Sequence, residues 1–341
     1  MTLPAGLRAR LGELFPGTHV VRAIPLRDDE TGGPEMKALG YGRPLRIQLS
    51  DGRTVVFHVL RPDDFGHDRR ADRVGNLVLA YDTFAQVPHH AHALDVGLVR
   101  DDGLLVSLAN TGEPYLVTSW VDGTLYADEL RHVHQHGASP VDVAHAEALA
   151  RVLLEIHAQP GSHPGAYTRA IRDLLGHGEG IFGLVDSYEG DVVPPARLRA
   201  LEEACLAWRW KLRDQTHRLR RTHGDFHPFN IVLASDRVHL LDASRGSEGD
   251  PADDVACLAI NFVFFGEPAR PLWDAFWRTY LAGDGGDVRA AVAPFFAWRA
   301  LVLASPKWYP HLAPGERERI LAFAEGALAA PRFDHEAGWP P

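Results

Sequence analysis

The hydrophobic pattern of the chain changes once, near residue 121, and this change limits the folds that the chain can adopt. Before it, apolar and polar residues alternate in "RPLRIQLS" and "RTVVFHVL", and the Asp51-Gly52 pair between these runs is a strong hairpin signal. After it, apolar residues recur at helical spacing, most clearly over residues 141–157. The pattern predicts an α+β chain in which a small antiparallel sheet precedes a larger, mainly helical part.

We expect two lobes, 1–121 and 122–341. The first lobe is expected to hold strands over "MKALGYG", "RPLRIQLS", "RTVVFHVL", "GLLVSLA" and "PYLVTSWV", with one helix over 71–85. The second is expected to hold helices over 141–157, 165–176, 195–217 and four segments after residue 252, with short strands after residue 230 and in "VHLLDAS". A length of 341 residues is sufficient for two such lobes.

Composition excludes several classes of protein. The 35 basic and 45 acidic residues give a net charge of -10, which disfavours binding to nucleic acid. Two cysteines, Cys205 and Cys257, are too few for a disulfide framework, and no apolar run reaches the roughly 18 residues of a membrane span. The start of the chain reads as a short amphipathic helix without the apolar core of a signal peptide. These features predict a cytoplasmic protein that does not enter a membrane.

The stretch "RTHGDFHPFNIVL" carries the strongest chemical signal. Asp225 and Asn230 lie on one Gly- and Pro-containing loop, and Asp242 follows the next apolar run in "VHLLDAS". Two carboxylates and an amide oxygen at one place are hard ligands that suit Mg²⁺ and a phosphate substrate. The alternative is that Asp225 caps a turn and Asn230 ends a loop. The ordered set, with "GDPADD" after it, favours phosphoryl transfer.

With these motifs the chain resembles the aminoglycoside phosphotransferase and choline kinase family. The matching elements are "HGDFHPFN", "LLDAS", "GDPADD" and the upstream helix ending "LLEIHA". The resemblance implies a protein-kinase-like bilobal fold, with ATP and Mg²⁺ as cofactors and a small-molecule hydroxyl as the acceptor.

The resemblance also implies roles for single residues. Asp225 corresponds to the catalytic base, and Asn230 and Asp242 to the metal ligands. His223 corresponds to the residue that buttresses the catalytic loop. Asp254 corresponds to the carboxylate that caps the next helix and braces the same loop.

The first lobe departs from the family pattern. Its third strand should carry a lysine that reaches the phosphates, paired with a glutamate on the following helix. The alignment places His58 and Asn76 at these two positions. Substitutes for the lysine are Lys37 or Arg43 first and His58 second, with Arg46 and Arg61 as flanking cations; His58 as a packed strand residue without a ligand is equally consistent with the sequence.

Other nucleotide contacts rest on position along the chain. "GYGRPL", with Gly40 and Gly42, is expected to cover the phosphates, and an ordinary hairpin is the alternative. Val56 shares a face with His58 and is expected to lie over the adenine. The backbone of Ser119, Trp120 and Val121 is expected to meet the adenine edge.

Two further groups of residues have simpler explanations. The histidines of "PHHAH" and "RHVHQHG" favour a solvated surface over a metal site. The aromatic residues of the C-terminal helices favour a core over a wall that binds a cation.

The sequence therefore predicts an ATP- and Mg²⁺-dependent kinase that phosphorylates a hydroxyl group of a small molecule. Two alternatives remain open. One is a pseudokinase that binds a nucleotide or metabolite without efficient phosphoryl transfer, because both members of the Lys/Glu pair are replaced. The other is a nucleotidyl transferase on the same fold.

Overall fold

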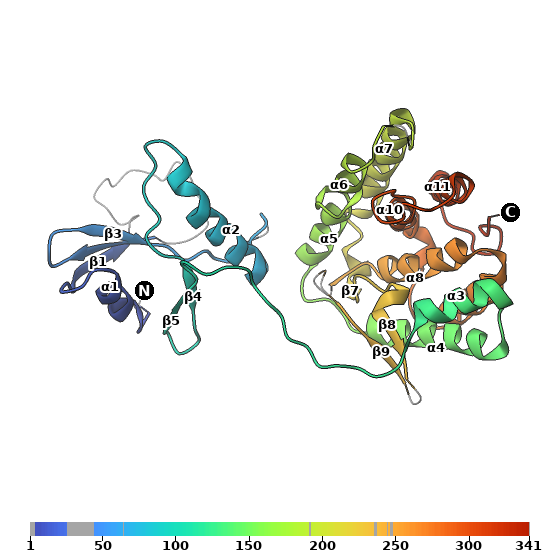
Figure 1. The fold of residues 1–341 in the computed structure, drawn as a ribbon, viewed down its shortest axis with the longest axis horizontal. Helices are drawn as coiled ribbons and strands as arrows, with labels where there is room; N and C mark the ends of the chain where they lie inside the picture. Colours follow the sequence, from blue (N-terminus) through green and yellow to red (C-terminus); the bar gives the residue numbers. More distant parts are fainter. Residues whose placement is uncertain are drawn as a thin grey trace. The chain divides into compact units, whose positions relative to one another are not determined.

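The computed structural model contains two compact units, Met1–Val117 and Thr118–Pro341, and each is described by itself (Figure 1). The residues that the structure describes are 4–25, 44–63, 65–190, 192–234, 237–243, 245 and 248–340. The strand expected over "MKALGYG" lies outside them. Lys37, Gly40, Gly42 and Arg43 therefore also lie outside the described residues.

The N-terminal unit is built on a three-stranded antiparallel sheet in the order β1 (Val20–Pro25), β2 (Leu45–Leu49) and β3 (Thr54–Phe57). The Asp-Gly hairpin is confirmed, and Gly52 has φ +89°, a left-handed conformation that glycine adopts without strain. Alternation along β2 buries Leu45, Ile47 and Leu49 on one face of the sheet. Helix α1 (Leu7–Leu14) covers this face and completes the core of the unit.

Helix α2 (Arg70–Thr83), the short 3-10 helix η2 (Phe84–Gln86) and the hairpin of β4 (Gly97–Val99) with β5 (Leu105–Ser107) follow. The strand expected over "PYLVTSWV" is wrong, because residues 111–122 contain neither strand nor helix. The apolar run has the composition of a strand, but its backbone has no ladder partner among the described residues. Tyr115, Leu116 and Trp120 are each more than 80% exposed.

The C-terminal unit is mainly helical, as the sequence predicts. Its core surrounds α8 (Ala252–Phe265) and α10 (Ala293–Leu303), which are buried on nearly every side. The remaining helices are α3 (Tyr126–His136), α4 (Pro140–His157), α5 (Pro164–Gly176), α6 (Ile181–Asp186), α7 (Pro195–Leu212), α9 (Arg270–Ala282) and α11 (Pro314–Ala329), with 3-10 turns η3 (Thr216–Arg218), η5 (Glu267–Ala269) and η6 (Val288–Ala290).

The aromatic residues of the C-terminal helices form part of this core. Trp273, Phe276, Trp277 and Tyr280 on α9 are fully buried and pack with one another and with residues of neighbouring segments. The core interpretation is therefore confirmed for these four residues, whereas Trp308 is 60% exposed and does not belong to the core.

Short strands in the C-terminal unit hold the loop that contains "HGDFHPFN". β7 (Arg220–Arg221) pairs with β10 (Glu248–Gly249) before the loop, and the 3-10 turn η4 (Pro228–Asn230) ends it. β8 (Ile231–Leu233) then pairs with both β6 (Thr124–Leu125) and β9 (Val238–Leu240). The loop is thus fixed at both ends by backbone ladders.

No helix of the described residues is long and apolar enough to cross a lipid bilayer.

Candidate active site

The carboxylate of Asp254 fixes the start of the loop. Asp254 lies in the first turn of α8 and is fully buried. Its Oδ2 accepts a hydrogen bond from the backbone N–H of His223 at 2.7 Å, and its Oδ1 accepts one from Gly224 at 2.8 Å. Gly224 has φ +82°, so the turn that presents both N–H groups to one carboxylate favours glycine. The bracing of the loop by Asp254 is therefore present in the structure.

A buried histidine supports this brace from the other side. Nε2 of His157, at the end of α4, lies 3.1 Å from Oδ2 of Asp254. Its Nδ1 lies 2.7 Å from the hydroxyl of Tyr280 on α9. The side chains of His157 and Asp254 are buried and have lost their contact with water, so these hydrogen bonds satisfy their polar groups. Two distant helices thereby position the loop.

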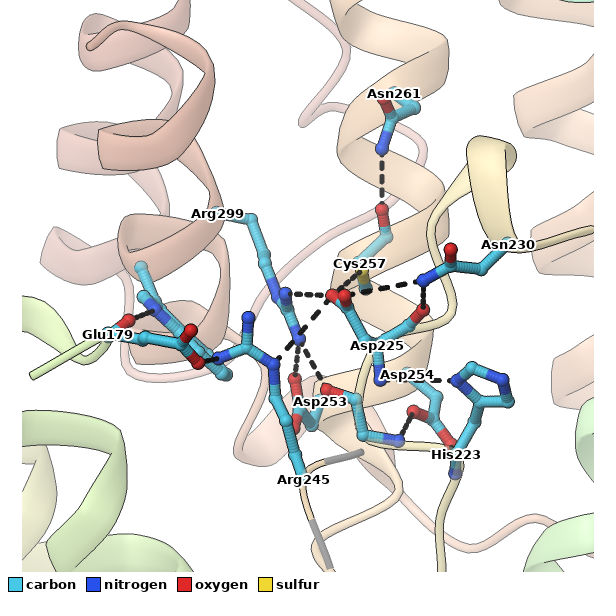
Figure 2. A network of polar contacts seen from close by, with 12 residues as sticks. Glu179, His223, Asp225, Asn230, Arg245, Asp253, Asp254, Cys257, Asn261 and Arg299 are labelled. Carbon is cyan, nitrogen blue, oxygen red and sulfur yellow. Dashed lines mark hydrogen bonds and ion pairs between the residues drawn. The ribbon is translucent and has the colours of Figure 1, made fainter. Parts of the chain in front are cut away.

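Asp225 is the centre of the polar network in Figure 2. Its Oδ1 accepts a hydrogen bond from Nη1 of Arg299 at 2.7 Å, and Nε of Arg245 lies 3.9 Å away. Burial alone raises the pKa of the Asp225 carboxyl, but the charges of Arg299 and Arg245 outweigh burial and hold this pKa below its usual value. The side chain is therefore a carboxylate at neutral pH.

Asn230 and Asp242 lie at the same end of the β8–β9 hairpin. Nδ2 of Asn230 donates to the backbone oxygen of Asp225 at 3.1 Å and to its Oδ2 at 3.3 Å. The backbone N–H of Leu241 donates to the carbonyl oxygen of Asn230 at 2.8 Å, so Asp242 follows directly beside Asn230. The structure thus brings the three oxygen-bearing residues of the sequence motif to one region.

The chemistry of these donors fits Mg²⁺. The amide nitrogen of Asn230 is engaged by Asp225, which leaves its Oδ1 available as a ligand. Asp242 is exposed, has φ +52°, and has no ion pair or hydrogen bond with the described residues. Carboxylate and amide oxygens are the ligands that Mg²⁺ prefers. Within the described ranges, no group of three or more His, Cys, Asp or Glu side chains is placed to hold a metal ion. The expected Mg²⁺ ligands, Asn230 and Asp242, include only one residue of these types.

The ring of His223 lies beneath the loop. It is 5% exposed, its Nδ1 accepts a hydrogen bond from the backbone N–H of Asp225 at 3.3 Å, and the ring packs edge-on against Phe226. Its Nε2 is buried and has no partner among the described residues. These contacts place His223 where it supports the backbone of Asp225.

His227, two residues after Asp225, is neutral. Burial lowers the pKa of its imidazole to about 4, although the nearby Asp225 carboxylate opposes this shift. The ring stacks on Phe229, and its Nδ1 accepts a hydrogen bond from the backbone N–H of Phe229. His227 therefore shapes the turn and adds no charge beside Asp225.

Most of the described residues that are expected to contact the nucleotide are exposed to solvent. Val56 is 59% exposed, and His58 and Asn76 are exposed as well. Arg46 and Arg61 also lie at the surface of the N-terminal unit. Ser119, Trp120 and Val121 belong to the segment without regular structure, and Trp120 is 86% exposed. Roles for these residues in nucleotide binding remain predictions.

The sequence motifs do not include two arginines that contact Asp225. Arg299 comes from α10 and Arg245 from the segment after β9. Arg245 also pairs with Glu179 at 3.1 Å, and both guanidinium groups lie over the ring of Trp298. One signal was available, because Arg299 is the only charged residue in the apolar helix "APFFAWRALVL". Such a residue is rarely buried unless it is paired.

A two-unit α+β chain with this loop belongs to the class of protein-kinase-like transferases. The model of the phosphotransferase enzyme family (APH) matches residues 69–295, which is more than half of the chain. The chain belongs to this family, and the predicted family and fold class are confirmed. It is accordingly a phosphotransferase.

Solved structures of several kinases are similar to the chain. A choline/ethanolamine kinase family protein from Mesorhizobium loti is 14% identical, with 78% of this chain and 83% of that chain covered and a TM-score of 0.40. A glucosamine kinase is 15% identical, with 96% and 99% covered and a TM-score of 0.42. A putative fructosamine-3-kinase from Thermobifida fusca is 18% identical, with 95% and 99% covered and a TM-score of 0.36. A search of curated proteins finds no match.

Proposed function

We propose that the protein is an ATP- and Mg²⁺-dependent kinase that phosphorylates a hydroxyl group of a small molecule. The observation that carries this proposal is the contact of the ionised Asp225 with Asn230, which the β8–β9 hairpin places beside Asp242. A base beside two hard-oxygen ligands is the arrangement that phosphoryl transfer requires.

Asp225 is proposed to act as the base. As the acceptor oxygen attacks the γ-phosphorus, its proton passes to the Asp225 carboxylate. A new bond forms between phosphorus and the acceptor oxygen, and the bond between phosphorus and the leaving ADP oxygen breaks. Most of the catalytic effect of such a site comes from position and charge, which accords with a loop held by Asp254 and Arg299.

Asn230 and Asp242 are proposed to hold the metal ion. When bound, Mg²⁺ neutralises charge on the phosphates and orients them. The hydrogen bonds of Asn230 with Asp225 fix its amide, so its oxygen keeps one orientation.

We also propose that residues 1–121 bind the nucleotide and residues 122–341 the acceptor. The candidates for phosphate and adenine contact are Lys37, Gly40, Gly42, Arg43, Val56, His58, Ser119, Trp120 and Val121. We propose a cytoplasmic location, since both cysteines are unpaired and buried.

A pseudokinase is the second candidate function. It is favoured by His58 and Asn76, which stand where the family pattern has a lysine and a glutamate. An imidazole has a shorter reach than the ammonium group of lysine and donates fewer hydrogen bonds.

Mass spectrometry tests these functions together. The purified protein is incubated with Mg²⁺, ATP and a metabolite pool, and the Asp225→Asn variant is the matched control. A product heavier by one phosphate, absent with the control, is expected. A gain of a nucleotide supports transfer of the nucleotidyl group, and ATP binding without any product supports the pseudokinase.

A further inference from the structure

Arg299 is a charged residue in an otherwise apolar, buried helix. It is 5% exposed, and its neighbours along α10 are buried apolar residues. Burial of a guanidinium group is unfavourable unless charges and hydrogen bonds replace the lost water. The partners of Arg299 therefore indicate what its charge is for.

All of its hydrogen bonds with the described residues lead to the candidate catalytic loop or to the helix beside it. Nη1 donates to Oδ1 of Asp225 at 2.7 Å, and Nη2 donates to the carbonyl oxygen of Gly224 at 2.9 Å. Nη2 also donates to Oδ1 of Asp253 on α8 at 2.7 Å. The guanidinium carbon lies 3.9 Å from the centre of the Trp298 ring. Figure 2 shows the guanidinium group of Arg299 next to the carboxylates of Asp225 and Asp253.

These contacts give the two oxygens of the Asp225 carboxylate different environments. Oδ1 receives the short, charged hydrogen bond of Arg299, with Arg245 and the thiol of Cys257 each at 3.9 Å. Among the described residues, Oδ2 receives only the longer bond of 3.3 Å from the amide of Asn230. Charge-assisted bonds are roughly twice as strong as neutral ones. Rotation of the carboxylate would exchange a strong bond for a weak one.

We propose that Arg299 is a positioning residue, which holds Oδ1 of Asp225 so that Oδ2 is the oxygen that receives the proton of the acceptor hydroxyl. This inference rests on the proposed kinase function. Arg299 acts through Asp225 and the loop backbone, because Nη1 and Nη2 both donate to protein oxygens and its Nε is buried without a partner among the described residues. A lysine ammonium can keep the charge but cannot reproduce the planar set of donors that reaches three acceptors.

The test compares Arg299→Met and Arg299→Lys with a control variant, Arg319→Met. Arg319 on α11 also donates hydrogen bonds to carbonyl oxygens, those of Val263 and Phe264 at the end of α8, and has no bond to the loop. Turnover of MgATP is measured with water as the acceptor, together with the KM for MgATP and the melting temperature.

Arg299→Met is expected to lower kcat roughly 100-fold, because loss of position alone has an effect of this order, while KM changes less than about threefold. Arg299→Lys should recover part of the loss. Arg319→Met should lower the melting temperature but keep kcat within about twofold of the unchanged protein. If Arg299 had only a structural role, Arg299→Met and Arg319→Met would instead have the same kcat and would lower the melting temperature by similar amounts.

A second measurement does not depend on turnover. The melting temperatures of Arg299→Met, Asp225→Asn and the double variant form a cycle, and the double variant should melt higher than the sum of the two shifts predicts, because Asp225→Asn removes the charge that Arg299→Met leaves unpaired. Additive shifts would overturn the contact. If the unchanged protein turns over MgATP and Arg299→Met has the same kcat, the positioning role is overturned but the proposed function is not. No turnover by the unchanged protein, either with water or with the metabolite pool, would overturn the proposed function together with this role.

Discussion

Asp225 is the residue on which the proposed reaction depends. Asp225→Asn removes the base but keeps the size of the side chain, so we expect kcat to fall by roughly 100- to 10,000-fold with little change in fold. Steady-state kinetics and circular dichroism measure the two effects. Asp214→Asn is the matched control, because Asp214 is 84% exposed and pairs with the adjacent Arg213 at the surface. Normal turnover in Asp225→Asn would exclude Asp225 as the base.

The exposed carboxylate of Asp242 gives a prediction about the metal. Asp242→Asn removes one of the two proposed ligands, so the concentration of free Mg²⁺ that gives half-maximal turnover should rise by at least roughly tenfold. A titration of Mg²⁺ at fixed ATP measures this concentration. Asp284→Asn, on a surface loop after α9, serves as the control. An unchanged Mg²⁺ requirement in Asp242→Asn would show that Asp242 does not hold the metal.

The bracing of the catalytic loop by α8 can be tested at the scale of these two elements. Asp254→Asn replaces an acceptor of two backbone hydrogen bonds with an amide that cannot accept both at one geometry. We expect the free energy of unfolding of the C-terminal unit to fall by about 2 to 3 kcal/mol. Urea unfolding followed by tryptophan fluorescence measures it.

Asp173→Asn on α5 is the comparison for this variant. Asp173 is half-buried and pairs with Arg169 and Arg172 on the same helix, and an ion pair between residues four apart on a helix contributes about 0.5 kcal/mol or less. Equal losses in the two variants would mean that other contacts hold the loop.

Gly224 gives a prediction about the shape of the loop. A Cβ at this position would lie 3.0 Å from the Cβ of Arg245, in a left-handed conformation that costs a side chain about 1 to 2 kcal/mol. Gly224→Ala should therefore lower stability by more than Gly137→Ala. Gly137 has nearly the same φ, +83°, but nothing within 4 Å of its Cβ. Thermal unfolding of both variants measures the difference, and equal shifts would show that Arg245 moves aside freely.

The whole molecule contains two cores of very different size. Among the described residues, the cluster of the N-terminal unit has five buried apolar residues, whereas the C-terminal cluster includes most residues of α8 and α10 and the large aromatic residues of α9. Small cores give low local stability. Amide hydrogen exchange is therefore expected to be faster in β2 and β3 than in α8, and MgATP should slow exchange in the N-terminal unit. Equal protection of β2 and α8 would contradict this expectation.

Local sequence determined much of this molecule. The Asp-Gly hairpin, the helix periodicity and the motif "HGDFHPFN" each depend on residues close together in the chain, so their structures follow from propensity and spacing. The same holds for Asn230 and Asp242, because a short antiparallel hairpin places its two ends side by side.

Only the tertiary structure decided which charges surround Asp225. Arg299 is 74 residues away along the chain, and its place in an apolar helix gives no sign of the partner that it meets. Tertiary contacts also decided that "PYLVTSWV" is not a strand and that Val20–Pro25 is one, because a strand exists only where a second backbone supplies its hydrogen bonds. Propensity acts between neighbours in the chain, whereas ladders and buried ion pairs join residues that folding alone brings together.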